Sequence, residues 1–394
     1  MLHPQELSSS QIGAVLAQAW GVRATSVVQR PAGADAGATV YQVGAHDGAR
    51  YWLKCRRYAV EDTVWQVLQH LRGPLGLVEV TAPQLALDGA AAVRADGLQW
   101  TLFAYIEGQS GFEAALSQAQ WRRLGEVLRQ VHEARLPPAL AAGLAQPGFD
   151  DDTAVERVGA WLRRGDARWP VPDALAAQYL ASWRQHRPRI AEVWQRCVAL
   201  RERLVRQPLR RVLCHGDLHA GNLLLRADGG LSLIDWDDML LAPRERDLML
   251  VGAAVGGRWG REDPPGFGDG YGPVVVEPAR LAYYRHWRIL QDVQEFHDLL
   301  LEPGAASRPP TQRRQALRYM DEQFAPGNVV DSAARSWAAA VDRTRTATQG
   351  VARCRLRRPG RLTRPAWPRR RRPARPRGAT VPPRDGRCRR WRRG

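Results

Sequence analysis

The stretch that decides the fold is His215-Gly-Asp-Leu-His-Ala-Gly-Asn222, followed by Leu223-Leu-Leu225, an Asp228-Gly-Gly turn and Leu231-Ser-Leu-Ile-Asp-Trp-Asp237. Two short apolar runs separated by such a turn predict a β-hairpin. A hairpin returns the chain to the edge from which it started. We therefore expect Asp235 to emerge beside the loop of residues 215–222, here called the polar loop.

The polar side chains of this segment are those that a phosphoryl-transfer site requires. Asp217 would orient a substrate hydroxyl and accept its proton late in the reaction. Asn222 offers a neutral oxygen and Asp235 an anionic one to Mg²⁺, a hard ion that prefers oxygen ligands. His215 is expected to brace the loop. His-x-Asp-x-x-x-x-Asn alone arises by chance, but the hairpin and the second acidic group that follow make the prediction specific.

The chain contains a single lysine, Lys54, and 57 arginines. Lys54 ends the strand-like run Tyr51-Trp-Leu-Lys54. A compact ammonium suits a phosphate-binding position better than a guanidinium fork does. We expect Lys54 to bind ATP phosphates, held in place by Glu61 at the start of the next helix, with Asp62 as the alternative.

Hydrophobic periodicity predicts a small sheet followed by a helical region. The N-terminal part should contain helices at residues 8–20 and 61–72 and strands near residues 27–28, 40–43, 51–53, 85–87 and 100–105. After residue 118 the period changes to that of helices, at residues 118–132, 174–206 with a break at Pro188, 244–255, 279–301 and 311–324. The loop at residues 31–39 lies where a phosphate loop would, although it lacks the usual glycine spacing. This pattern indicates an α+β fold.

The net charge of +18 is concentrated at the C-terminus. Residues 351–394 contain 18 arginines and one acidic residue, so the other 350 residues carry a net charge of only +1. Such a segment cannot form a core. We interpret residues 341–394 as a tail that is disordered or read out of frame; a nucleic-acid-binding arm is the alternative.

The five cysteines show neither zinc-ligand spacing nor a disulfide framework. Neither a signal sequence nor an apolar run long enough for a membrane span is evident. We therefore expect a cytoplasmic monomer with reduced thiols.

Further stretches, at residues 121–132, 234–238, 241–249, 283–289 and 326–330, complete a pattern that resembles the aminoglycoside phosphotransferase family, whose fold is like that of protein kinases. The resemblance covers residues 10–335. It implies an N-terminal lobe at residues 1–104, a hinge at 105–108 and a helical C-terminal lobe at 109–340. Backbone groups of Ala104 and Ile106 in that hinge would read the adenine of ATP.

The resemblance also implies ATP and Mg²⁺ as cofactors and a hydroxylated, usually cationic antibiotic as substrate. Within the family, the likeness is to members that act on the aminocyclitol spectinomycin. A cationic substrate would meet acidic residues of the C-terminal lobe. The candidates are Asp237, Asp238, Glu245, Asp263, Asp292 and Glu295.

We therefore expect an ATP-dependent kinase of an aminocyclitol antibiotic. A kinase of another small hydroxylated metabolite, such as choline or homoserine, is the first alternative, because fold does not fix substrate. A degenerate kinase or a binding module with a basic tail is the second. The presence of Lys54, Asp217, Asn222 and Asp235 argues against degeneration.

Overall fold

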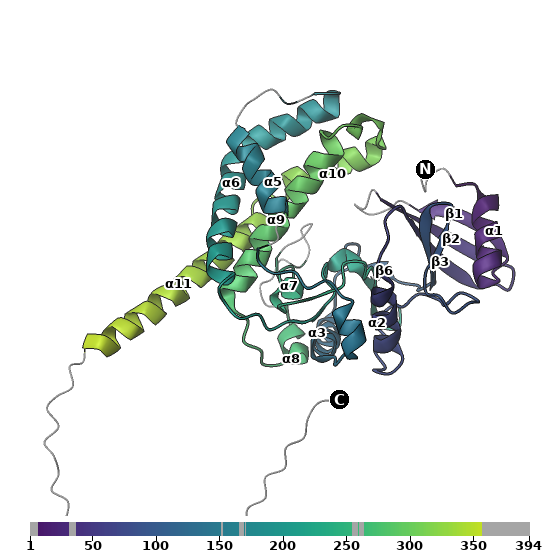
Figure 1. Cartoon of the computed structure of the whole chain (residues 1–394), viewed down its shortest axis with the longest axis horizontal. Coiled ribbons are helices and arrows are strands. Elements are labelled where there is room, and N and C mark those ends of the chain that lie inside the picture. Colours follow the sequence, from purple (N-terminus) through teal and green to yellow (C-terminus); the bar gives the residue numbers. More distant parts are fainter. Residues whose placement is uncertain are drawn as a thin grey trace, which may run out of the picture. The chain divides into compact units, whose positions relative to one another are not determined.

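The structure is a computed structural model (Figure 1), and it describes residues 7–30, 37–150, 153–164, 169, 171–253, 259 and 264–356, with side chains as far as residue 342. Asp263, most of the loop at residues 31–39 and residues 357–394 lie outside the described residues.

The N-terminal part is a five-stranded antiparallel sheet in the order β1-β2-β3-β5-β4. Its strands are β1 (Ala24–Arg30), β2 (Ala38–Ala45), β3 (Arg50–Arg56), β4 (Val93–Ala95) and β5 (Leu98–Ala104). Helix α1 (Ser9–Trp20) lies against one face of this sheet (Figure 1). The helix begins with a capping box, in which Ser8 and Gln11 exchange side-chain and backbone hydrogen bonds.

Strand β3 turns alternate residues to opposite faces of the sheet. Leu53 and Cys55 are fully buried in the core under α1. Lys54 and Arg56 therefore lie together on the other face, where Arg56 is buried and Lys54 is partly buried. The register places Lys54 opposite Thr101 of β5. This period of two brings both cations to one side of the sheet.

A second core joins α2 (Asp62–Arg72), α3 (Gln118–Glu133) and the hairpin of β8 (Leu223–Leu225) and β9 (Leu231–Leu233). The predicted hairpin is present, with Leu223 opposite Leu233. Strand β6 (Gln109–Ser110) extends it to three strands, and β7 (Val212–Cys214) pairs with β10 (Leu240–Ala242). These short strands hold both ends of the polar loop. They also hold both ends of residues 234–239, here called the acidic segment.

A third core is helical. It contains α5 (Thr153–Arg164), α6 (Ala174–Leu204), α9 (Pro278–Leu300), α10 (Pro310–Glu322) and the first part of α11 (Val329–Leu356). The shorter helices are α4 (Pro138–Ala142), α7 (Glu245–Leu248) and α8 (Phe267–Tyr271), of which α8 packs against α3. The expected α+β architecture, an antiparallel sheet followed by a helical remainder, is confirmed.

Four local predictions were wrong. The segment at residues 85–87 is not a strand, and the fifth strand is instead β4. Helix α6 continues through Pro188, which is exposed, so the lost hydrogen bond faces water. Helix α7 ends at Leu248, well before residue 255, and α11 extends past residue 340 to Leu356.

We searched the described residues for a membrane-spanning helix, and none combines the required length with sufficient hydropathy.

Candidate active site

Asp247 of α7 fixes the start of the polar loop through two hydrogen bonds to its backbone. One carboxylate oxygen accepts the backbone N–H of His215 at 2.9 Å, and the other accepts that of Gly216 at 2.8 Å. Gly216 has φ +90°, and a Cβ there would lie 2.0 Å from the carbonyl oxygen of Asp238. Only glycine at position 216 therefore allows the polar loop to approach the acidic segment this closely.

His215 is fully buried and braces the loop from inside. Its Nε2 donates to the Ile234 carbonyl at 2.9 Å, so its Nδ1 is free to accept from the Asp217 N–H at 3.3 Å. Asn222 Nδ2 donates to the Asp217 carbonyl at 2.8 Å. His215 thus lies behind the site, whereas Asp217 and Asn222 are held to each other across the loop.

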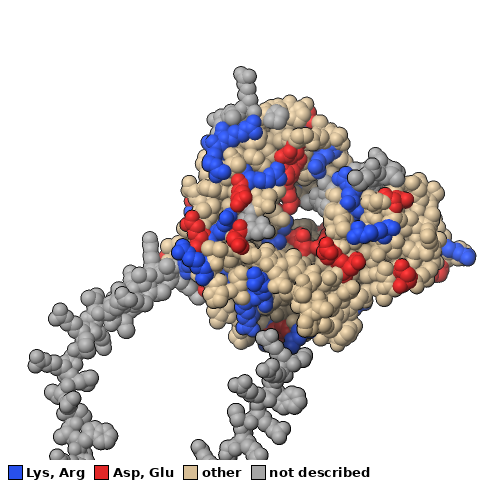
Figure 2. Space-filling view, in the orientation of Figure 1, with Lys and Arg blue, Asp and Glu red and all other residues tan. Residues whose placement is uncertain are grey.

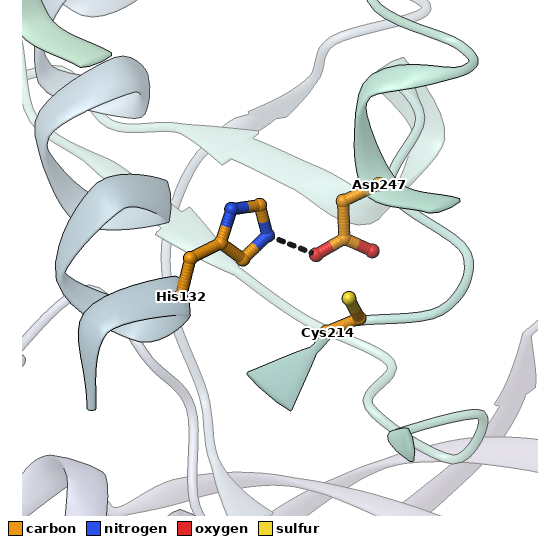
Figure 3. A group of neighbouring side chains, drawn as sticks. All are labelled: His132, Cys214 and Asp247. Carbon is orange, nitrogen blue, oxygen red and sulfur yellow. Dashed lines mark hydrogen bonds and ion pairs between the residues drawn. The ribbon is translucent and has the colours of Figure 1, made fainter. Parts of the chain in front are cut away.

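Asp247 belongs to a buried group with His132 of α3 and Cys214 of β7 (Figure 3). Three such side chains could suggest a metal site, but their polar atoms are engaged. His132 bridges Asp247 at 3.0 Å and the Tyr271 hydroxyl at 2.6 Å. Burial raises the pKa of the Cys214 thiol well above its usual value, so the thiolate that a metal would need is disfavoured. The group supports the loop rather than a ligand.

The polar loop meets β3 through what we call the lysine cluster: Lys54, Arg56, Asp235 and Asp237. Lys54 Nζ lies 2.7 Å from Asp235 Oδ1 and 2.8 Å from Asp237 Oδ2. Burial would lower the pKa of Lys54, but Asp235 and then Asp237 raise it above its ordinary value, so the group is an ammonium. Lys54 is therefore placed beside the acidic segment across 181 residues of sequence.

The expected pairing of Lys54 with a carboxylate of α2 is not found. Glu61 is the exposed N-cap residue of α2, Asp62 is also exposed, and the carboxylate partners of Lys54 among the described residues are Asp235 and Asp237. The prediction for Glu61 as the lysine partner was wrong because the buried face of α2 is wholly apolar.

Asp237 was expected to contact substrate, but in this structure its oxygens are engaged by cations from β3. Its two oxygens accept from Arg56 Nε at 2.6 Å and Arg56 Nη2 at 2.7 Å, in addition to Lys54. Burial opposes ionisation, but Arg56 and Lys54 hold the pKa of Asp237 at about 2. Asp235 differs, because its side chain is 42% exposed and its backbone has φ +61°, a left-handed value. Such strain is often retained at functional sites.

On the other side of Asp217 lies a second group, the acidic cluster: Asp217, Asp238, Asp292 and Glu295 around Arg288. Arg288 Nη1 contacts Asp217 Oδ1 at 2.5 Å, and its Nε contacts Asp292 at 2.8 Å. His219 Nε2 lies 3.5 Å from the other oxygen of Asp217, and its ring stacks on Phe112. Burial opposes ionisation of Asp217, yet Arg288 holds its pKa below the ordinary range.

The remaining carboxylates of the acidic cluster are poorly compensated. Asp238 is exposed and Asp292 is half-buried, and partial desolvation of their carboxyls together with the charge of Asp217 raises the pKa of both. Glu295 is exposed, but partial desolvation of its carboxyl and the charge of Asp292 raise its pKa to about 7, although Arg288 opposes the shift. Figure 2 shows acidic and basic side chains side by side around the hollow in the middle of the view. Arg288 and, beside Asp238, Arg246 therefore meet four carboxylates, more acidic groups than these two arginines can balance.

Glu245 does not belong to this cluster. It is 3% exposed and accepts the backbone N–H of Glu277 at 2.8 Å, at the start of α9. It was predicted to bind substrate, but in this structure its carboxylate is buried against the start of α9.

Ala104 ends β5 opposite Tyr51, and Ile106 follows two residues later. The N–H of the intervening Tyr105 donates to the Arg50 carbonyl at 3.0 Å. The Tyr105 ring stacks on Trp52, with ring centres 5.3 Å apart. These contacts hold the connection between the sheet and β6 beside β3.

Sequence reasoning did not identify Arg56 and Arg288. Among 57 arginines, no local pattern marks either one as a site residue. Only the position of Arg56 two residues after Lys54, on the same face of a strand, was a usable signal.

Comparison with known proteins agrees with this geometry. The model of the phosphotransferase enzyme family matches residues 28–287. The structure of spectinomycin phosphotransferase APH(9)-Ia with ADP and spectinomycin is 28% identical, with a TM-score of 0.76, and the match covers 84% of this chain and 99% of that one. The AMP-bound complex of the same enzyme matches with a TM-score of 0.71, 28% identity and coverage of 83% and 98%.

Amicoumacin kinase hAmiN, in complex with AMP-PNP, Ca²⁺ and amicoumacin, is 14% identical with a TM-score of 0.52, over 82% of this chain and 95% of that one, and supports the fold alone. No curated protein sequence matches the chain. The family match covers more than half of the residues and confirms the resemblance to aminoglycoside phosphotransferases. The chain therefore belongs to the phosphotransferase enzyme family and is a kinase-like enzyme that phosphorylates a hydroxyl group.

Proposed function

We propose that the protein transfers the γ-phosphoryl group of ATP to a hydroxyl of a cationic aminocyclitol antibiotic, with spectinomycin as the favoured acceptor. The observation that carries the proposal is the meeting of Lys54 with Asp235 at 2.7 Å, directly beside the loop that presents Asp217 and Asn222. Positioning and charge neutralisation provide most of the catalysis in phosphoryl transfer.

Lys54 and the backbone of Ala104 and Ile106 form the nucleotide side of this proposal. Lys54 would release Asp235 and bind the phosphates, because an ammonium exchanges one anionic partner for another with little movement. The sheet at residues 1–104 would act as the nucleotide-binding lobe, residues 105–108 as the hinge and residues 109–340 as the lobe that binds the acceptor.

The residues present suit Mg²⁺. Asn222 uses its amide nitrogen on the Asp217 carbonyl, which leaves the amide oxygen as the coordinating atom. Asp235 is an exposed carboxylate whose backbone is in a left-handed conformation. Bound Mg²⁺ would neutralise charge on the phosphates. The donor set of one amide and one carboxylate oxygen fits its preferences.

The acidic cluster supports a cationic acceptor. Three carboxylates beyond Asp217 share the charges of Arg288 and Arg246 there, so an ammonium group would relieve their remaining mutual repulsion. Asp217 would orient the acceptor hydroxyl through the oxygen that Arg288 leaves open. The ATP-rich, reducing cytoplasm suits this activity and the buried thiols of Cys55 and Cys214.

Release of ADP from Mg²⁺-ATP tests the proposal, with spectinomycin beside other aminoglycosides, choline and homoserine as acceptors. Spectinomycin-dependent ADP release supports the proposal in full. Turnover with choline alone would show that the acceptor is a metabolite and not the antibiotic. Choline also carries a cation and a hydroxyl. Absence of both turnover and ADP binding would overturn it in favour of a degenerate kinase.

A further inference from the structure

We infer that Asp237, clamped by Arg56, is the carboxylate that positions the Lys54 ammonium for the nucleotide phosphates, in place of a carboxylate from helix α2. The inference rests on the proposed function, since that function gives Lys54 its phosphate-binding role. Asp237 is thus a positioning residue, and it acts on the nucleotide only through Lys54.

The geometry leaves Asp237 little freedom. Arg56 holds both of its oxygens, and Lys54 shares Oδ2 with Arg56 Nε at 2.8 Å and 2.6 Å. Arg56 is itself only 1% exposed and donates to Thr101 Oγ1 at 2.6 Å. Strands β3 and β5 therefore fix the Arg56 guanidinium. The guanidinium in turn fixes Asp237, and Asp237 fixes the position of the Lys54 ammonium relative to β3.

Helix α2 provides no alternative carboxylate. Its buried face consists of Val64, Trp65, Val67, Leu68 and Leu71. The ring of Trp65 lies under the Arg56 guanidinium, 5.3 Å from its carbon. Trp65 of α2 thus contacts Arg56 through its aromatic ring, and α2 places no carboxylate beside Lys54.

Asp235 cannot replace Asp237 in this role. Its side chain is exposed, and in the proposed function its oxygens belong to the metal. When Asp235 turns to the metal, Asp237 remains as the anionic partner of Lys54. The Asp237 side chain is only 12% exposed, so water screens this interaction weakly.

The test compares the affinities of ADP and adenosine for the full-length protein, measured by calorimetry. Asp237→Asn removes the charge and keeps the shape. Because that change leaves a buried arginine unpaired, the double variant Arg56→Met with Asp237→Asn removes both charges and protects the fold. Asp173→Asn is the matched control, because Asp173 makes a bidentate pair with Arg313, which is 4% exposed and far from the site.

We expect both Asp237 variants to bind ADP about tenfold more weakly than the wild type. A loss of this size corresponds to one hydrogen bond between charged groups. Adenosine should bind with unchanged affinity, because it has no phosphate for Lys54 to contact. The acceptor KM should also be unchanged, and Asp173→Asn should bind both ligands normally. A loss that is equal for ADP and adenosine, or no loss in a folded variant, would overturn the inference.

The wild-type protein separates this inference from the proposed function. If the wild type binds no ADP, the proposed function itself fails. If the wild type binds ADP and turns over, while the double variant retains full ADP affinity, only the role of Asp237 is refuted.

Discussion

The lysine cluster and the acidic cluster lie on either side of the polar loop, but they balance charge differently. Lys54 and Arg56 face Asp235 and Asp237, so two cations meet two carboxylates. In the acidic cluster, Arg288 and Arg246 face four carboxylates, and partial desolvation together with its acidic neighbours raises the pKa of Glu295 to about 7. The first cluster is already organised without a ligand, whereas the second has an excess of negative charge that a cationic ligand would satisfy.

This difference indicates how the two substrates would bind. A preformed cluster can accept a nucleotide by exchanging one anion for another, at little cost in reorganisation. An uncompensated cluster gains affinity and specificity from the charge of the acceptor itself. Asp217 lies at the boundary, since Arg288 of the acidic cluster holds it while its backbone carbonyl belongs to the Asn222 contact.

The largest effect should come from the boundary residue. Asp217→Asn removes the group that orients the hydroxyl and accepts its proton, so kcat should fall by about 10²–10⁴-fold. ADP affinity should be unchanged, because Asp217 makes no contact with Lys54. Steady-state kinetics and calorimetry on the same preparation measure both quantities. Near-normal kcat would show that Asp217 is not the catalytic carboxylate.

Lys54→Met should have the next largest effect and should be confined to the nucleotide. Loss of the ammonium removes a charged contact to the phosphates, so the KM for ATP should rise by roughly 10–100-fold. The acceptor KM should stay the same, because Lys54 is separate from the acidic cluster. An equal rise in both KM values would contradict the division of the site into two clusters.

A smaller effect, confined to the acceptor, is expected for Glu295→Gln and Asp292→Asn. Each change removes negative charge from the acidic cluster, so at pH 8, where Glu295 is ionised, the KM for a cationic acceptor should rise by about tenfold for Asp292→Asn and by a few-fold for Glu295→Gln. The KM for ATP should not change. Glu302→Gln provides the control, because Glu302 follows α9 and pairs with Arg157 instead of Arg288. If the acceptor KM is unaffected in both variants, the cationic acceptor binds elsewhere.

The smallest effect is a pH dependence. Because the pKa of Glu295 is raised to about 7, this carboxyl is neutral below that pH and anionic above it. The KM for a cationic acceptor should therefore fall by a few-fold between pH 6 and pH 8, roughly the effect of one partly screened charge. Glu295→Gln should flatten the profile. A profile of the wild type that is flat, or that slopes the other way, would exclude Glu295 from acceptor binding.

The sequence alone determined the local framework and the candidates for the reacting groups. The alternation of β3 predicted the strand that carries Lys54, and the two apolar runs around Asp228-Gly-Gly predicted the hairpin that brings Asp235 beside Asp217 and Asn222. Such patterns are read within a few residues, where strand and turn preferences act. The family followed from the same segment, because its spacing is set by that local geometry.

Only the tertiary structure decided which charges meet. It paired Lys54 with Asp237 instead of Glu61, buried Glu245 at the start of α9, and brought Arg288 to Asp217 across 71 residues of sequence. The sequence shows 57 arginines with similar surroundings, and an ion pair leaves no local pattern. The packing of α9 and α2 against the polar loop and β3 selects Arg288 and excludes Glu61, because Coulomb interactions depend on distance in space and on burial.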